Sequence, residues 1–161
     1  MTEKINMFNV VMVEPEIPPN TGNVARTCAA TSTKLHLVEP LGFSIDDKHL
    51  KRAGLDYWPY VDIEIHSSLD AFMKKYGKEP IYLATTKAEK KYTDVAYEDG
   101  AFIMFGKETK GLPRAFIDAH ADRAVRIPMA QQTNLRSLNL SNSVNIILFE
   151  ALRQKNFPGL F

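Results

Sequence analysis

Short apolar runs alternate with helix-like stretches along this chain, and the alternation predicts an α/β fold. The apolar runs that have the length and composition of buried strands cover residues 8–13, 34–38, 61–65, 81–85, 102–105 and 124–127. Strands that alternate with helical patterns indicate βαβ units. We therefore expect a mostly parallel sheet with helices on both faces.

Helix-like stretches fill most of the gaps between these runs. We expect helices from near Asn20, over residues 46–54 with a basic character, over residues 67–76, after Pro113, and over residues 141–154. Gly77 has the position of a C-cap glycine, and Pro113 suits the first position of its helix because proline has no amide hydrogen to leave unpaired. No element is expected in the polar stretch of residues 86–100.

Composition narrows the class of protein without naming a function. The 161 residues fit one domain, and the 45% hydrophobic and 24% charged fractions are ordinary for a globular chain. The net charge of +1 means that any basic footprint for nucleic acid must be local. Cys28 is the single cysteine, so no internal disulfide can form. The N-terminus lacks the pattern of a signal peptide and no apolar run approaches about 18 residues, so we expect a cytoplasmic protein without a membrane partner.

Three polar, glycine-bearing segments follow predicted strands, and they indicate where a ligand would bind. They cover residues 20–26, 105–113 and 126–142. In an open α/β sheet, ligands bind in the crevice beyond the carboxyl ends of the strands. The three segments therefore predict one composite site, rich in backbone amides, amide side chains and hydroxyls, of the kind that binds a nucleotide-like ligand.

The common phosphate, dinucleotide and metal motifs do not match. Gly106 and Gly111 have the spacing of a Walker A loop, but Leu112 and Pro113 stand where that loop needs lysine and serine or threonine. No Gly-x-Gly-x-x-Gly follows the first strand. The four histidines show no ligand-like spacing, so no metal is expected.

The segments, taken in order, resemble the motifs of the SPOUT class of RNA methyltransferases. Within it, the match is to the small ribose 2′-O-methyltransferases of the tRNA wobble nucleotide, the TrmL or YibK-like group. The matching pieces are residues 14–23 with Arg26, residues 52–57, residues 105–113, residues 126–129 and residues 138–142. The resemblance spans nearly the whole chain.

The resemblance implies a fold, a methyl donor and partners. It implies one domain over residues 1–161 with a C-terminal trefoil knot, the knotted cofactor-binding part covering about residues 78–155. It also implies S-adenosyl-L-methionine as co-substrate, a homodimer, and the tRNA anticodon stem-loop as partner. The knot is not what the pattern alone would suggest, because threaded chains are rare. The residues that the resemblance places at the cofactor are Ala84, Gly106, Ile127, Met129, Ser137, Leu138 and Asn142.

The same resemblance implies catalytic roles for Arg26, Asn20, Glu108 and Asn139. The reaction would move the methyl group of a sulfonium to the 2′-hydroxyl of a C- or U-type wobble nucleotide. Related enzymes assign the base to the arginine at position 26, but a guanidinium has no lone pair with which to accept a proton. Arg26 is better suited to hold a phosphate and orient the hydroxyl, and the proton would pass to a phosphate oxygen, to Glu108 or to water.

Local lysines and arginines would contact the RNA backbone. The candidates are Lys48, Lys51, Arg52, Lys87, Lys90, Lys91, Lys107, Lys110 and Arg114. Two alternatives stay open at this point: the same chemistry on another RNA such as ribosomal RNA, and a non-catalytic RNA-binding module with the same fold.

Overall fold

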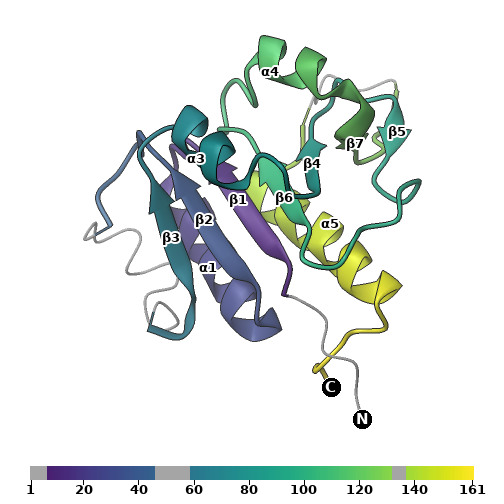
Figure 1. Cartoon of the computed structure of the whole chain (residues 1–161), viewed down its shortest axis with the longest axis horizontal. Helices are drawn as coiled ribbons and strands as arrows, with labels where there is room; N and C mark the ends of the chain where they lie inside the picture. The colour runs from purple at the N-terminus through teal and green to yellow at the C-terminus, as the bar shows by residue number, and fades with distance from the viewer. Residues whose placement is uncertain (1–6, 46–58, 132–136) are drawn as a thin grey trace.

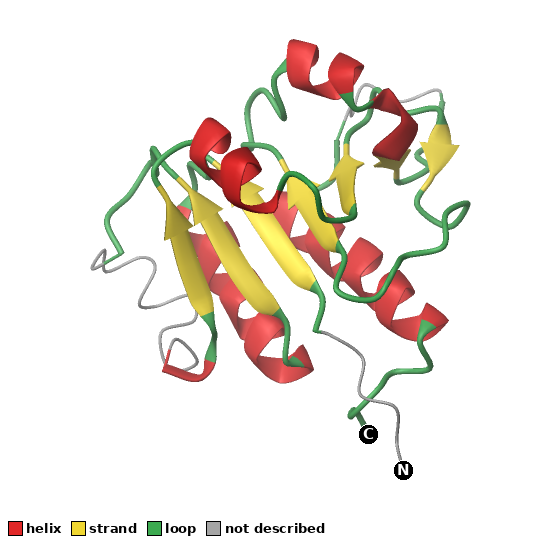
Figure 2. Ribbon diagram, viewed as in Figure 1, coloured by secondary structure: helices red, strands yellow, loops and turns green. Residues whose placement is uncertain are grey.

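One seven-stranded sheet organises the computed structural model of the chain, which describes residues 7–45, 59–131 and 137–161. Its strands lie in the order β3-β2-β1-β6-β4-β7-β5, and every pair is parallel, which confirms the predicted sheet (Figure 2). The strands are β1 (Asn9–Val13), β2 (Lys34–Val38), β3 (Ile63–His66), β4 (Ile81–Ala84), β5 (Lys90–Lys91), β6 (Phe102–Phe105) and β7 (Ala124–Arg126).

Helices cover both faces of this sheet, as predicted. On one face α1 (Pro18–Thr31) packs beside α5 (Leu140–Gln154), and α3 (Leu69–Tyr76) lies on the other (Figure 1). The short helix α4 (Arg114–Ala119) and a 3₁₀ turn (Ala121–Arg123) connect β6 to β7.

Alternation along β1 explains why the core has two halves. Val10 and Met12 pack in the cluster with α1 and α5, whereas Val11 and Val13 pack in the cluster with α3 and α4. All four side chains are at most 2% exposed. A parallel strand that is buried on both faces reads as a continuous apolar run, which is why this strand was visible in the sequence.

Two of the helices begin with side-chain caps. The Ser68 hydroxyl accepts from the Ala71 amide at 3.0 Å and starts α3. The Asn139 side chain accepts from the amides of Ser141 and Asn142 and starts α5. At the other end of α3, Gly77 is the C-cap residue, and a Cβ there would lie 2.3 Å from the Met73 carbonyl oxygen.

Several boundaries differ from the sequence prediction. The first helix begins at Pro18 rather than near Asn20, because prolines suit its first turn and its cap comes from a distant loop. Pro113 is the N-cap of α4 and not its first helical residue. The polar stretch 86–100 contains β5, a two-residue edge strand too short to leave a pattern. The predicted basic helix over residues 46–54 lies outside the described residues, and the trefoil knot stays a prediction.

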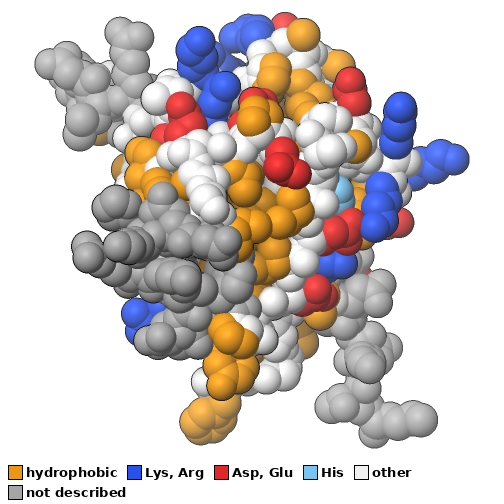
Figure 3. Space-filling view, turned by 90° about the vertical axis from the view of Figure 1, so that its left-hand side faces the viewer, with side chains coloured by type: hydrophobic (Ala, Val, Ile, Leu, Met, Phe, Trp, Pro, Cys, Tyr) orange, Lys and Arg blue, Asp and Glu red, His pale blue; other side chains and the backbone are white. Residues whose placement is uncertain are grey.

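The β3 edge of the sheet carries apolar as well as charged side chains. Figure 3 shows the face on this side of the molecule, where a band of hydrophobic side chains is bordered by lysine, arginine and carboxylate groups. Near this edge Tyr60 is 79% exposed and Ile65 is 42% exposed.

Candidate active site

A cavity of about 860 Å³ lies at the carboxyl ends of β1, β4, β6 and β7, beside the start of α5. Its volume is in the range of small-ligand sites, about 300–1,000 Å³. Nine of the eleven site residues predicted from the sequence line it: Asn20, Ala84, Gly106, Glu108, Ile127, Met129, Ser137, Leu138 and Asn139. The three polar segments therefore meet at one site, as the rule for open α/β sheets predicts.

A tight glycine loop after β6 forms one wall of the cavity. The Gly111 amide donates to the Lys107 carbonyl at 2.9 Å and closes the loop. A Cβ on Gly106 would lie 2.1 Å from the Gly111 carbonyl carbon and the Leu112 nitrogen. Gly111 adopts a φ of +67°, which glycine tolerates without cost. Gly106 is thus required by the loop's own closure, and the loop presents its main chain to the cavity as a consequence.

Glu108, in the middle of this loop, ties the loop to the start of α1. Its carboxylate accepts from the amides of Glu16 and Ile17 at 2.8 and 2.7 Å, and from the Asn20 side-chain amide at 3.2 Å. The helix has no side-chain cap of its own, so Glu108 supplies the cap from 91 positions away in the chain. The two oxygens of Glu108 thus accept three hydrogen bonds that hold the glycine loop against the start of α1.

A reciprocal contact strengthens the same connection. The Glu16 carboxylate accepts from the Thr109 hydroxyl at 2.7 Å and from the Thr109 amide at 3.0 Å. These hydrogen bonds, together with the charges of Lys107 and Lys110, hold the pKa of Glu16 below its usual value, although burial acts in the opposite direction. The segment before α1 and the glycine loop are therefore joined from both sides.

A chain of amide side chains extends this connection to α5. The Asn139 side-chain nitrogen donates to the Asn20 oxygen at 3.2 Å, and the Asn139 oxygen accepts from the Ser141 amide at 3.0 Å. Asn20 is 6% exposed. Glu108, Asn20 and Asn139 thus form a continuous polar relay that connects the glycine loop, α1 and the first turn of α5.

Arg26 and Asn142, the other two predicted site residues, do not line this cavity. They line a second hollow of about 360 Å³ between α1 and α5, together with Asn23, Asn145 and Phe149. The first turn of α5 separates the two hollows, because Asn139 and Ser143 border the first while Ser141 and Asn142 border the second. Within this chain, Arg26 and Asn142 therefore lie on the other side of that turn from the nine predicted residues that line the large cavity.

The rim of the large cavity is basic. Lys87, Lys107, Lys110 and Arg114, all RNA-contact candidates from the sequence, line it. Lys90 instead donates to the Asp122 carbonyl at 3.1 Å, and Lys48, Lys51 and Arg52 lie outside the described residues. The cavity wall also contains Glu14, Thr85 and Thr86, which sequence reasoning did not single out as functional.

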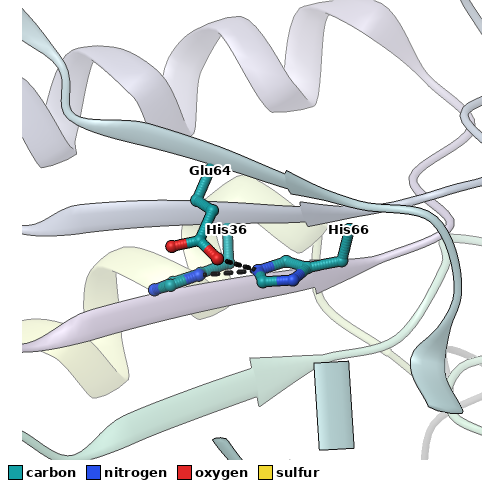
Figure 4. A group of neighbouring side chains, drawn as sticks. All are labelled: His36, Glu64 and His66. Atoms are coloured by element: carbon teal, nitrogen blue, oxygen red, sulfur yellow. Dashed lines mark hydrogen bonds and ion pairs between the residues drawn. The ribbon is translucent and has the colours of Figure 1, made fainter. Parts of the chain in front are cut away.

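A second group of titratable side chains lies away from this cavity, between β2, β3 and α3 (Figure 4). The ligand atoms of His36, Glu64 and His66 lie within 4.8 Å of one another. Sequence reasoning treated these histidines as scattered, because it lacked the β2–β3 register that makes His36 and His66 diagonal neighbours on one face.

Hydrogen bonds and ion pairs connect this group into a structural network. His36 Nε2 donates to the Asn9 oxygen at 3.0 Å, so His36 Nδ1 accepts from His66 Nε2 at 3.0 Å. The Asn9 amide is oriented by donation to the Gly100 carbonyl. Glu64 forms ion pairs with Lys34 and Lys75 at 3.0 and 2.7 Å, so two cations already neutralise the charge that a metal ion would need.

This network predicts a loss of stability in mild acid. Burial, followed by the charges of His66 and Lys34, lowers the pKa of His36 from 6.5 to about 3. Between these values the unfolded chain binds a proton that the folded protein does not, so stability is complete above pH 6.5 and falls as the pH is lowered. His36 alone should cost about 2 kcal/mol of unfolding free energy between pH 7 and pH 5.

Urea denaturation at the two pH values measures this loss. A His36→Gln variant is expected to be less stable than the parent at pH 7 but to lose less stability on going to pH 5. An equal loss in both proteins would show that another group causes the acid sensitivity.

Among the described residues, no helix is long and apolar enough to cross a bilayer.

The model of the SpoU rRNA methylase family matches residues 7–149. A tRNA (cytidine(34)-2′-O)-methyltransferase of Burkholderia pseudomallei is 49% identical over 156 residues, which cover 95% of this chain and 99% of the relative. The tRNA (cytidine(34)-2′-O)-methyltransferase of Escherichia coli K12 is 46% identical over 154 residues, which cover 95% and 97%. A solved structure described by the words "Structural insights into the 2-OH methylation of C/U34 on tRNA" has a TM-score of 0.84 and 39% identity, and the match covers 94% of this chain and 97% of that one.

Proposed function

Because the chain belongs to the SpoU rRNA methylase family, we propose that it transfers a methyl group from S-adenosyl-L-methionine to the ribose 2′-hydroxyl of a tRNA wobble nucleotide of C or U type. Relatives at 46–49% identity over nearly the full chain carry names with this activity at position 34. The observation that carries the proposal is the cavity at the carboxyl ends of the strands, where the three polar segments meet.

The large cavity is the proposed donor site. Ala84, Gly106, Ile127, Met129, Ser137 and Leu138 line it from four different segments, and the closed glycine loop offers main-chain amides and carbonyls for an adenine and a ribose. Asn142 lies across the first turn of α5, and its backbone amide donates a hydrogen bond to the Asn139 side-chain oxygen at 3.3 Å. We therefore assign Asn142 to support of that turn and not to direct contact with the donor.

The chain's own residues would align the hydroxyl with the methyl group rather than activate the donor, whose sulfonium is already reactive. Alignment of this kind can supply several kcal/mol of the barrier reduction. Asn20 and Asn139 border the cavity in a fixed orientation because the relay holds both side chains. Arg26 would clamp a phosphate of the RNA from the second hollow.

We propose that the active form is a homodimer that covers the second hollow. Phe149 lines this hollow and is 44% exposed, and Ile17 and Leu138 at the edge of the large cavity are 44% and 43% exposed. A second copy over this face would bury these side chains and would bring an Arg26 toward the neighbouring donor site.

Replacing Phe149 by glutamate should dissociate such a dimer. The side chain is half exposed in one chain, so the charge is tolerated there, but at an apolar interface it would be buried without a partner. Light scattering coupled to gel filtration should find the parent at twice the 18.2 kDa chain mass and the variant at the chain mass. Phe157→Glu, at a 39% exposed side chain just beyond α5, is the control. A monomeric parent would contradict the proposal.

The RNA would reach the donor site over its lysine-lined rim. Phosphate contacts by Lys87, Lys107 and Lys110 make binding depend on salt rather than on sequence, so the fit of one nucleotide into the cavity has to provide selectivity. The partner is therefore the anticodon stem-loop, which presents an unstacked nucleotide, and the cytoplasm is the proposed location.

The direct test is methyl transfer to defined RNA. The purified protein and labelled S-adenosyl-L-methionine should methylate a tRNA, and nucleoside mapping should place the methyl on the ribose of nucleotide 34. The same tRNA with a 2′-deoxy nucleotide at that position is the control and should accept none. Methylation of ribosomal RNA alone would move the substrate to the alternative, and donor binding without transfer would favour a binding module.

We also propose that residues 1–161 form one domain. Its cofactor-binding part, about residues 78–155, would carry the trefoil knot that the resemblance implies. The donor-site residues on β4 and in the loops after β6 and β7 all fall inside this part.

A further inference from the structure

The cavity wall contains a carboxylate, that of Glu14, that has no partner among the described residues. Of the described residues, two acidic ones line the cavity, Glu14 and Glu108. The Glu108 oxygens are occupied by three N–H donors. The Glu14 side chain, in contrast, forms no hydrogen bond or ion pair in the structure as described, although it is half-buried. The other charged residues described on the wall are lysines and an arginine, whose side chains supply hydrogen-bond donors.

Glu14 is also held in a backbone conformation that glutamate rarely adopts. Its φ is +52°, in the left-handed region, which costs roughly 1–2 kcal/mol for a residue with a Cβ. Such a conformation persists only where the surroundings impose it, and it gathers at functional sites.

The surroundings of Glu14 do impose its position from several sides. Its amide donates to the Val38 carbonyl at 2.9 Å, which fixes it to the end of β2. The Gly42 amide donates to the Pro15 carbonyl at 2.9 Å, and a Cβ on Gly42 would lie 2.8 Å from the Glu16 backbone. On the other side, Glu108 and Thr109 hold Glu16. A strained residue at the end of β1 is thus fixed beside the glycine loop.

We infer that Glu14 accepts the proton of the ribose 2′-hydroxyl during methyl transfer, an inference that rests on the proposed function. The ribose oxygen forms a bond to the methyl carbon while the bond from that carbon to sulfur breaks. The hydroxyl proton passes to the Glu14 carboxylate, and the products are the 2′-O-methyl ribose and S-adenosylhomocysteine.

With Glu14 as the base, proton removal and alignment of the hydroxyl are performed by different residues. Asn20 and Asn139 are held by the relay and can only orient a hydroxyl, since a side-chain amide is not a base. Glu14 is the one carboxylate on the described part of the wall that can accept a proton without first losing a hydrogen bond.

Two substitutions test the inference on the 161-residue protein with S-adenosyl-L-methionine and tRNA. Glu14→Gln keeps the size of the side chain and removes the base, and the single-turnover rate at saturating donor should fall about 100-fold or more. Calorimetry should find donor affinity unchanged. Glu79→Gln, at an exposed position before β4, is the matched control and should keep the parent rate.

Glu14→Gly provides a readout that a structural role would not affect. Glycine accepts the left-handed φ without strain, so the fold is preserved, and the missing side chain leaves room for a small carboxylate. Added formate should restore part of the single-turnover rate in proportion to its concentration, and it should leave the parent rate unchanged.

Each other outcome overturns the inference. Normal turnover by Glu14→Gln would show that no base is needed there. Weaker donor binding with a normal rate at saturation would make Glu14 a donor ligand. A slow Glu14→Gly variant that formate does not rescue would make Glu14 an orienting group. Failure of the proposed function is visible separately, because the parent itself would then transfer no methyl group to nucleotide 34.

Discussion

Replacing Gly106 by alanine is expected to abolish binding of S-adenosyl-L-methionine. The added Cβ would lie 2.1 Å from backbone atoms of Gly111 and Leu112, and backbone on both sides cannot rotate away as a flexible side chain could. The glycine loop would have to open, and the wall of the cavity that it forms would be lost. We expect calorimetry to find donor affinity reduced at least about 100-fold, which is close to 3 kcal/mol.

Gly111→Asn is the matched control in the same loop. A Cβ at Gly111 has no atom within 4 Å, and only its φ of +67° opposes a side chain. Asparagine tolerates the left-handed region better than other residues with a side chain, so a cost of about 1 kcal/mol and retained donor binding are expected. Tight donor binding by Gly106→Ala would remove the large cavity from consideration as the donor site.

Replacing Glu108 by alanine is expected to cost both stability and donor affinity. The substitution removes the acceptor for the Glu16 and Ile17 amides and for the Asn20 side chain, and α1 has no cap of its own to replace it. Hydrogen bonds to a charged acceptor contribute about 1.5–3 kcal/mol, and water can replace part of this at the exposed Ile17. We expect a loss of about 2–3 kcal/mol, and thermal unfolding should report a Tm lower by about 5–10 °C.

In the Glu108→Ala variant, donor affinity should fall together with stability, because the glycine loop loses its hydrogen bonds to the start of α1. Glu89→Ala, an exposed glutamate on the loop before β5, serves as the control and should leave both measurements unchanged. If Glu108→Ala kept the parent Tm but transferred no methyl group, Glu108 would be the proton acceptor after all, and the role of Glu14 would have to be abandoned.

The difference between Glu108 and Glu14 illustrates what residue type and spacing can and cannot predict. Both follow buried strands, but only Glu108 lies in one of the three polar segments from which the sequence predicted the site. Glu108 was a catalytic candidate by resemblance, whereas Glu14 was only part of a matching motif. The hydrogen bonds of the folded chain instead make Glu14 the candidate base, because the Glu108 carboxylate is held by three donors. These donors lie 88 to 92 positions away from Glu108 in the chain. No local pattern encodes a contact over such a separation.

The buried histidines are a second feature that residue type and spacing could not predict. His36 and His66 belong to different strands, 30 positions apart, and their hydrogen bond exists only because β2 and β3 pair in one register. Each histidine alone reads as an ordinary polar residue in an apolar run. The contact between the two histidines, and the acid sensitivity that follows from it, could be recognised only from the strand pairing in the sheet.

The sequence by itself determined the elements and the end of the sheet at which the site lies. Buried runs such as residues 102–105 predict strands because a parallel strand is covered on both faces, and the polar segments after them meet because parallel strands share one carboxyl end. Tertiary structure alone decided which of the gathered side chains are free to act. Strand order and the packing of α1 against α5 placed Arg26 on the far side of a helical turn and gave Glu108 its three donors. They left Glu14 with no partner in the part of the chain that the structure describes, because hydrogen-bond partners are set by proximity in space and not along the chain.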